Sequence, residues 1–254
     1  MDINLQSSEL NGGIVEQIEL GHWRLSIPQG QAGEYRLAQL DDYKILSRKE
    51  FPWQKPTKTS FKMRASGDDL PGTWGVGFWN DPLSLPLGLG GGLRRFPALP
   101  NAAWFFFASS HSSLSINDDL PANGQMAMSI SSPKLPSWAI AIGSLFSPLL
   151  FIRPVAKIVR KIARKIVKQD TSEINHDPRQ WHQYSILWEN KKLNLSVNGS
   201  TVLETNILPN GPLGLVIWID NQFAGYHPNG KINFGTLANP ASWIEVKGLK
   251  VEFL

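Results

Sequence analysis

The chain of 254 residues has no cysteine, which excludes disulfides, thiolate metal sites and thiol nucleophiles. Its N-terminus, MDINLQSSELNGG, lacks the basic and apolar regions of a signal peptide, so we expect a cytoplasmic protein. Acidic residues are missing from Pro121 through Gln169. Within this span, residues 135–152 carry no charge and residues 153–168 carry seven cations, so the segment differs in character from the rest of the chain.

The excess of positive charge is confined to that segment. The formal net charge is +4, from 25 Lys and Arg against 21 Asp and Glu. Removing the seven cations of residues 153–168 leaves 18 cations against 21 anions, a remainder of −3. A broadly basic surface is therefore not expected, and we expect no nucleic-acid partner.

Short runs of alternating apolar and polar residues indicate strands on both sides of the segment. The expected strands are 22–28, 34–43, 59–66, 73–80, 102–110, 182–189, 192–199, 213–220 and 243–254. Residues 182–199 predict a hairpin that turns at Glu189, Asn190 and Lys191. Strands at this spacing predict a sandwich or jelly roll, with a hydrophobic and cationic helical insertion at about 133–170 in a single domain spanning 1–254.

Residues 154–168 have helical periodicity. Val155, Ile158, Val159, Ile162, Ile166 and Val167 fall on one stripe, with cations on the other face, and Pro154 suits the first turn. Three interpretations remain open: an interfacial amphipathic helix or lid over a ligand, a structural helix packed on its own sandwich, and a membrane span at 135–152. The residues expected to face a membrane or form a lid are Trp138, Phe146, Phe151, Lys157, Arg160, Lys161, Arg164 and Lys165.

Two parts of the β-sequence resemble a known family. FKMRASGDDLPGTWGVGFWNDP is similar to the strand–loop–strand of laminarinase-like β-glucanases in the concanavalin A-like lectin/glucanase superfamily. WHQYSILWENKKLNLSVNGSTVLETN, GPLGLVIWIDNQ and ASWIEVKGLKVEFL resemble its later strands. The resemblance covers roughly residues 20–130 and 178–254. It implies an all-β, concanavalin A-like jelly roll of two curved antiparallel sheets, with a ligand cleft on the concave face.

The catalytic motif of that family is missing. Members that cleave glucans carry an E-x-D-x-(x)-E strand after the GTW strand, and retaining hydrolysis needs two carboxyl groups about 5 Å apart. The matching strand here is AAWFFFASS, without an acidic residue. We therefore do not expect a classical retaining glycosidase. A glycoside hydrolase with displaced carboxylates is the least favoured alternative.

Aromatic and amide side chains on the expected cleft strands are the candidate ligand-binding residues. Alternation places Trp104 and Phe106 on one face of their strand, opposite Phe105 and Phe107. Aromatic rings stack on sugars and also suit apolar ligands. The candidate set is Trp74, Trp79, Asn80, Trp104, Phe106, Trp218 and Asn221.

Four side chains are candidates for acid–base chemistry. Asp81 and Asp220 directly follow expected strands, His111 follows the 102–110 strand, and Tyr226 lies in a downstream loop. No spacing of histidines and carboxylates suggests a metal site. The aspartate pairs at 68–69 and 118–119 sit in turn-like contexts, which leaves turn chemistry and a structural Ca²⁺ as alternatives. We otherwise expect no cofactor.

The sequence favours a non-hydrolytic binding domain whose aromatic cleft takes a glycan or an apolar small molecule. The insertion then docks on a membrane, so that the protein is peripheral to it, or acts as a lid. The alternative is an enzyme, such as a cyclase or isomerase of a hydrophobic natural product, that uses a strand-end Asp or His. Residues 81–100, rich in Gly, Pro and Leu, predict a functional or mobile loop.

Overall fold

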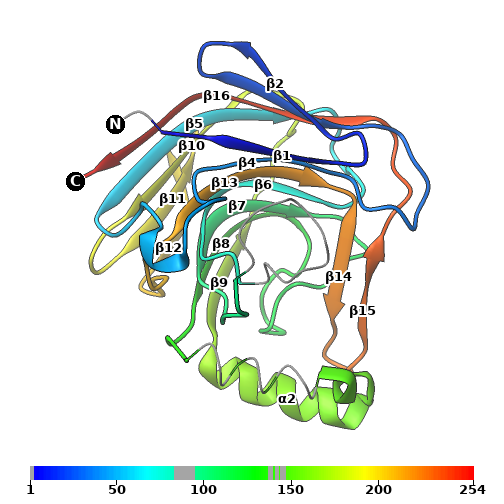
Figure 1. Cartoon of the computed structure of the whole chain (residues 1–254). Coiled ribbons are helices and arrows are strands. Elements are labelled where there is room, and N and C mark those ends of the chain that lie inside the picture. Colours follow the sequence, from blue (N-terminus) through cyan, green and yellow to red (C-terminus); the bar gives the residue numbers. More distant parts are fainter. Residues whose placement is uncertain (1–2, 83–94, 137–139, 141–142, 144–146) are drawn as a thin grey trace.

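The computed structural model describes residues 3–82, 95–136, 140, 143 and 147–254. Two large antiparallel sheets lie face to face and curve in the same sense (Figure 1). Sheet A has the order β1-β4-β13-β6-β7-β8-β9, and sheet B has the order β12-β11-β10-β5-β16-β3-β2. A separate hairpin, β14–β15, projects beyond sheet A. The expected sandwich of antiparallel sheets is confirmed.

Sheet A is built from β1 (Gln6–Leu10), β4 (Leu37–Asp41), β13 (Gly214–Asp220), β6 (Thr73–Trp79), β7 (Ala102–Ala108), β8 (Gly124–Ser131) and β9 (Lys168–Glu173). Sheet B is built from β12 (Ser200–Thr205), β11 (Leu193–Val197), β10 (His182–Trp188), β5 (Thr57–Ala65), β16 (Ser242–Phe253), β3 (His22–Ile27) and β2 (Ile14–Glu19). The hairpin pairs β14 (Gln222–Tyr226) with β15 (Ile232–Thr236). The helical elements are η1 (Arg48–Glu50), η2 (Ser147–Phe151) and α2 (Arg153–Ile166).

Period-two alternation fills the space between the sheets. Along β7, Phe105 and Phe107 point into this core, and Tyr184, Ile186 and Trp188 of β10 meet them from sheet B. Phe61 of β5 stacks on Tyr184 with ring centroids 5.5 Å apart. Burial of these large apolar side chains is the main contribution to the stability of the sandwich.

The expected hairpin of residues 182–199 is confirmed. Trp188 of β10 pairs with Leu193 of β11, and the Glu189 N–H donates to the Lys192 carbonyl at 2.9 Å, which closes the turn. β10 also pairs with β5 on its other side. The hairpin therefore extends sheet B outward from its centre.

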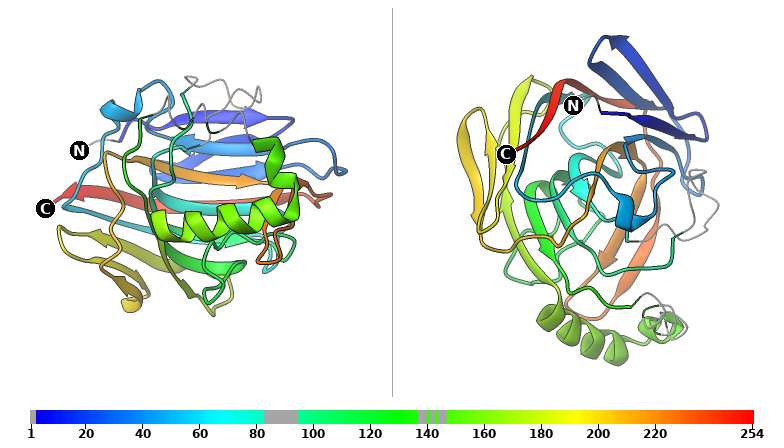
Figure 2. Two further views of the ribbon diagram at one scale, coloured as in Figure 1. Left: turned by 90° about the horizontal axis from the view of Figure 1, so that it is seen from below. Right: turned by 60° about the vertical axis from the view of Figure 1, so that its left-hand side comes forward.

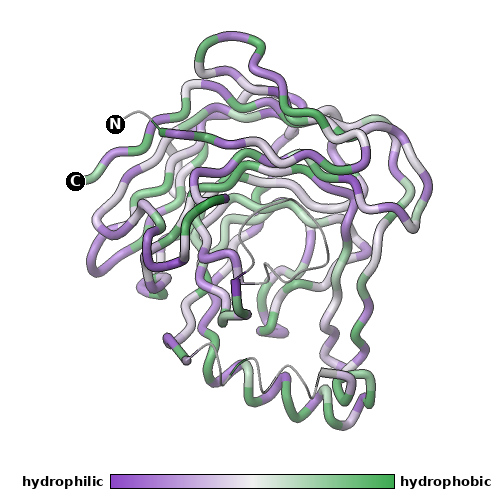
Figure 3. Tube along the Cα trace, in the orientation of Figure 1, coloured by the Kyte–Doolittle hydropathy of each residue, from purple (hydrophilic) through white to green (hydrophobic). Residues whose placement is uncertain are grey.

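The segment between β8 and β9 contains the expected helix, whose isoleucines are exposed rather than packed on the sandwich. β8 and β9 are neighbours, with Ser131 paired to Lys168, so residues 132–167 leave and re-enter sheet A at one point. The α2 helix lies across the open side of sheet A, between β9 and the β14–β15 hairpin (Figure 2). Apolar and polar residues alternate along it (Figure 3).

The residues that α2 buries are Ala156 and Arg160, not the isoleucines of the expected stripe. Ile158, Ile162 and Ile166 are exposed by 62%, 52% and 39%. In the part of the chain that the structure describes, there is no helix with the length and apolarity that crossing a bilayer requires. Trp138, Phe146 and most of the 81–100 loop, including its four glycines, lie outside the described residues.

Candidate functional site

Four aromatic side chains gather on the concave face of sheet A, on the side away from the core. The ring of Trp104 lies 5.1 Å from that of Phe106, 5.5 Å from that of Trp218 and 5.8 Å from that of Trp79, centroid to centroid. Phe106 and Trp218 are buried, whereas Trp79 and Trp104 are half-buried. These four rings are the concave aromatic cluster. The alternation of β7 predicted that Trp104 and Phe106 share a face, and β6 and β13 add Trp79 and Trp218.

Two glycines on β6 make room for this cluster. Gly75 pairs with Phe106 and Trp218 on its two sides, and Gly77 pairs with Trp104. A Cβ on Gly75 would lie 2.8 Å from the Trp218 ring, and one on Gly77 would lie 2.3 Å from Trp104 Cβ. Because neither position has a side chain, the rings of the flanking strands lie across β6.

Trp74 corrects the expectation that every tryptophan of β6 lines the cleft. Its ring lies in the core between the sheets and stacks on Phe107 at 5.2 Å, with an interplanar angle of 18°. Along TWGVGFW, Trp74 alternates with Gly75, so they point to opposite faces. The concave neighbours that the sequence reasoning missed are Tyr43, Phe51, Met126, Met128 and Val216. The alternation in QMAMS was the signal for the two methionines.

The polar candidates that follow β6 (Asn80 and Asp81) and those at the end of β13 (Asp220 and Asn221) do not lie together. β6 and β13 are antiparallel and pair Thr73 with Asp220, so the residues that follow the two strands lie at opposite ends of the strand pair. Asp81 lies at one end and Asp220 at the other. The expectation that these strand ends supply polar groups around one face is therefore corrected by the strand direction.

Asp220 closes the end of sheet A where β6 begins. Its Oδ1 accepts from the Thr73 N–H at 3.1 Å, the Thr73 hydroxyl at 2.9 Å and the Gln222 N–H at 3.0 Å, and its Oδ2 accepts from Tyr35 at 3.3 Å. Burial raises the pKa of the Asp220 carboxyl to about 7, against the lowering effect of these hydrogen bonds. Trp218 Nε1 donates to the same Thr73 hydroxyl at 3.0 Å, which links Asp220 to the aromatic cluster.

At the opposite end of these strands, Asp81 is held in an ion pair. Arg95 Nη1 donates to Asp81 Oδ2 at 2.7 Å, and both side chains are buried. Arg48 donates to the backbone carbonyls of Asn80 and Asp81 at 2.7 and 2.5 Å. Asp81 has φ 45°, a left-handed conformation that aspartate tolerates in turns. These contacts connect residues 48, 80–81 and 95 rather than presenting a carboxylate to a ligand.

The side chains of the two candidate asparagines form hydrogen bonds with backbone groups. Asn80 Oδ1 accepts from the Asn101 N–H at 2.9 Å, and its Nδ2 donates to the Leu99 carbonyl at 2.8 Å. Asn221 is fully buried, and its Oδ1 accepts from the Arg36 N–H at 2.8 Å. Its Nδ2 donates to the Glu34 and Leu237 carbonyls, both at 2.9 Å. Both asparagines fix loops, which corrects their assignment to ligand binding.

His111 and Tyr226 lie near the β14–β15 hairpin. His111 is exposed, and its ring contacts Phe223 edge-on at 6.4 Å. The Tyr226 hydroxyl donates to the Ala156 carbonyl of α2. Tyr226 thus has a role in holding α2 and does not face the concave aromatic cluster.

Arg160 fixes α2 to the sandwich. It is 4% exposed, donates to the Tyr226 carbonyl and to the Ser115 carbonyl at 2.9 Å, and pairs with Asp118 at 2.5 Å. Arg164 pairs with the other oxygen of Asp118 at 2.9 Å. The expectation that Arg160 faces a membrane is corrected, because its guanidinium group is buried and bound to other residues of the fold. Lys157, Lys161 and Lys165 are exposed, as is Phe151.

The concave aromatic cluster offers rings for stacking on a ligand rather than carboxyl groups for acid–base chemistry. The concave positions in the middle of β7 are Trp104 and Phe106. The described residues contain no group of three or more His, Cys, Asp or Glu side chains that would hold a metal ion. Asp118 of the second aspartate pair binds Arg160 and Arg164.

Comparison with known proteins gives the fold. No family model matches the chain, and no curated protein matches it in sequence. A legume lectin-like domain from Entamoeba histolytica superposes with a TM-score of 0.54 at 10% identity, covering 99% of this chain and 90% of that one. LamAcat from Zobellia galactanivorans gives a TM-score of 0.49 at 11% identity, with 94% and 79% covered. The chain therefore has the concanavalin A-like jelly-roll fold that the sequence resemblance implied.

Proposed function

We propose that the protein is a glycan-binding jelly-roll domain that holds its ligand on the concave aromatic cluster without cleaving it. The observation that carries this proposal is the occupation of the concave positions of β7 by Trp104 and Phe106. A sugar ring stacks on the faces of such side chains, whereas retaining hydrolysis requires a pair of carboxyl groups across the bond. Trp79 and Trp104 are the half-buried members, so they are the rings that a ligand reaches.

The enzyme alternative finds less support in the geometry. Asp81 is paired with Arg95, Tyr226 donates to α2, and Asp220 accepts four hydrogen bonds from residues around its own strand end. A general base needs a free oxygen or nitrogen within reach of a substrate proton. Each of these groups is already engaged in holding the fold.

Binding and cleavage are separated by following the same oligosaccharide. The protein is applied to a glycan array, and the sugars it retains are incubated with it and analysed by mass spectrometry. The proposal predicts retained, intact oligosaccharides. Shortened products would overturn it in favour of hydrolysis. Failure to retain any glycan, together with a co-purified lipid or terpenoid in native mass spectra, would replace the glycan with an apolar ligand.

We also propose that α2 docks the domain on an anionic membrane surface. Its outward side carries two adjacent rows, Ile158–Ile162–Ile166 and Lys157–Lys161–Lys165, each at i, i+4 spacing. We call these two rows the α2 outer face. The exposed Phe151 and Ile152 precede it in the chain. Isoleucines beside lysines match the boundary between acyl chains and anionic headgroups.

Vesicle sedimentation tests this docking. The protein is mixed with phosphatidylcholine vesicles that contain or lack phosphatidylglycerol, and each Lys contributes about 1 kcal/mol to binding at an anionic surface. We expect binding only to the anionic vesicles. When Lys157, Lys161 and Lys165 are all changed to Gln, the affinity for these vesicles should fall by about two orders of magnitude. Ile162→Ser should weaken binding, whereas Leu20→Ser, which alters a more exposed apolar side chain far from α2, should not. Equal sedimentation of all variants would contradict the proposal.

A further inference from the structure

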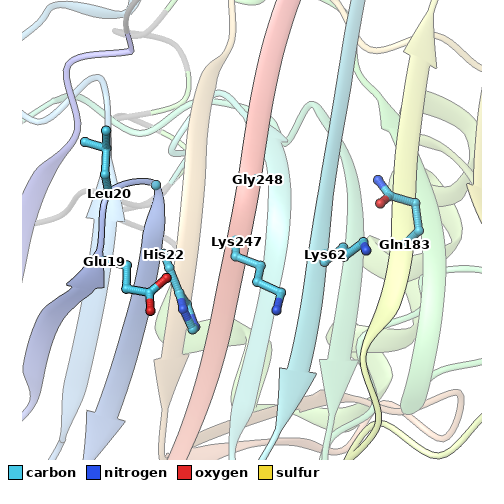
Figure 4. Close-up of a pocket in the computed structure, with 8 residues that line it drawn as sticks. Glu19, Leu20, His22, Lys62, Gln183, Lys247 and Gly248 are labelled. Atoms are coloured by element: carbon cyan, nitrogen blue, oxygen red, sulfur yellow. The ribbon is translucent and has the colours of Figure 1, made fainter.

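A row of polar side chains crosses the outer face of sheet B, on the opposite side of the core from the concave aromatic cluster. Register places Gln183 beside Lys62, Lys62 beside Lys247, and Lys247 beside His22. These four side chains project from neighbouring strands into one depression, at whose rim Glu19 lies (Figure 4). Four successive strands thus contribute to one surface site, here called the outer lysine site.

The two lysines at its centre are cross-strand neighbours of like charge. Opposed like charges destabilise a sheet when nothing neutralises them. The residues beside the pair are an amide, Gln183, and an imidazole, His22, rather than carboxylates. Among the residues that the structure describes, neither Lys62 nor Lys247 forms an ion pair.

The buried carboxylate of Glu245 is already paired with two arginines. Glu245, two residues before Lys247, is 1% exposed. Its Oε1 accepts from Arg24 Nε at 2.9 Å, and its Oε2 accepts from Arg64 Nε at 2.8 Å. Burial opposes ionisation of Glu245, but the bonds from these two arginines hold its pKa below the usual value. Glu245 therefore balances Arg24 and Arg64 and, in the described part of the chain, forms no ion pair with either lysine.

The position of Lys247 is fixed by an aromatic ring. Its ammonium lies 4.0 Å from the centroid of Trp181, and Arg64 lies 4.8 Å from the same ring. His22 contacts the edge of Trp181 at 5.6 Å, and its buried Nε2 lies 3.6 Å from Glu245 Oε2, beyond hydrogen-bond distance. The site thus holds the ammonium of Lys247 in place against an aromatic ring.

We propose that the outer lysine site binds an acidic sugar residue, with its carboxylate or sulfate between Lys62 and Lys247. The lysines supply the charge that an oxyanion needs. Gln183 and Glu19 supply acceptor oxygens, which sugar hydroxyls use and a bare inorganic oxyanion does not. This site is separate from the concave aromatic cluster, so it binds a second segment of glycan or a different glycan.

The test is isothermal titration of the whole protein with a glucuronate oligosaccharide, a sulfated oligosaccharide and a neutral oligosaccharide of equal length. We expect the acidic sugars to bind and the double variant Lys62→Gln/Lys247→Gln to bind them at least tenfold more weakly. Lys191→Gln, which removes an exposed lysine at the β10–β11 turn, is the matched control and should leave binding unchanged. Inorganic sulfate should bind much more weakly than the sulfated sugar.

Several outcomes would overturn the proposal. They are an unchanged affinity in the double variant, an equal loss in Lys191→Gln, and tighter binding of single-stranded DNA than of the acidic sugars. The thermal stability of the single variant Lys62→Gln provides a second test, which does not depend on a ligand. Because this variant relieves the opposed charges, it should leave the melting temperature at low salt equal to or above that of the wild type, and a clear fall would show that the pair is satisfied within the sheet.

Discussion

At the scale of single residues, the concave face depends on small side chains as much as on large ones. Trp104 and Trp218 lie across β6 only because Gly75 and Gly77 carry no Cβ. Alternation in TWGVGFW and AAWFFFASS was readable from the sequence. The placement of Trp74 in the core and of Asp81 in an ion pair with Arg95 was not, because both depend on partners distant in the chain.

Asp220 leads to a prediction about pH. Its folded pKa of about 7 lies above the ordinary value of 3.8, so the folded state favours the proton, and stability falls as pH rises from about 4 to about 7. Asp220→Asn removes this ionisation while its oxygen keeps the three bonds to Oδ1. We expect the variant to match the wild type near pH 4 and to exceed it by up to about 4 kcal/mol at pH 8.

Urea unfolding from pH 4 to pH 8 measures this difference directly. Asp42, whose pKa burial also raises to about 7, contributes a similar slope to both proteins and cancels in the comparison. An identical pH slope in wild type and variant would contradict the assignment of Asp220 as a buried structural carboxyl.

At the scale of elements, α2 shows how tertiary contacts override a helical pattern. The helix forms where its periodicity predicts, with Pro154 in the first turn. Its orientation follows instead from Arg160, which finds the Tyr226 and Ser115 carbonyls and Asp118, acceptors that no local pattern reveals. The isoleucine row consequently faces outward.

Arg160→Met should release α2 from the sandwich. The change removes charge-assisted hydrogen bonds and costs about 2 kcal/mol of local stability, while the strands keep their pairing. Hydrogen exchange should accelerate in the amides of α2 and remain slow in β7 and β10. Lys161→Met, one residue along on the exposed side, serves as the control, and equal exchange in both variants would argue against Arg160 as the main docking contact.

Several strands mark the limit of prediction from sequence. The strands that were not expected are β1, β2, β8, β9, β12, β14 and β15. Among them, KQDTSE and IVEQIE are largely polar or exposed and show little of the alternation that half-burial produces. The central strands β5, β6, β7, β10 and β13 were expected because they are buried on one or both faces. The register between them, which creates the outer lysine site, is set by long-range pairing.

At the scale of the whole molecule, the chain leaves and re-enters sheet A at one point to form the insertion. Ser131 pairs with Lys168, and the same register places Ser132 opposite Val167. Replacing residues 133–166 by Asn-Gly therefore closes β8 and β9 with a two-residue turn that suits the twist of a hairpin. We expect a folded jelly roll with a strand-rich circular dichroism spectrum and cooperative thermal unfolding, but without binding to anionic vesicles.

This variant also tests the division of the chain into one domain and an insertion. Loss of cooperative unfolding would show that α2 is an integral part of the sandwich. Retained vesicle binding would move the membrane-docking surface away from the α2 outer face.

The central claim is that the concave aromatic cluster binds a glycan that the protein does not cleave. Titration of a glycan retained on the array into wild type, Trp104→Leu and Trp181→Leu tests it most directly, since Trp181 is a half-buried tryptophan of the opposite face. We expect Trp104→Leu to weaken binding at least tenfold, a loss of about 1.4 kcal/mol, and Trp181→Leu to leave the affinity for a neutral glycan unchanged. Equal affinities in the wild type and Trp104→Leu would contradict the claim.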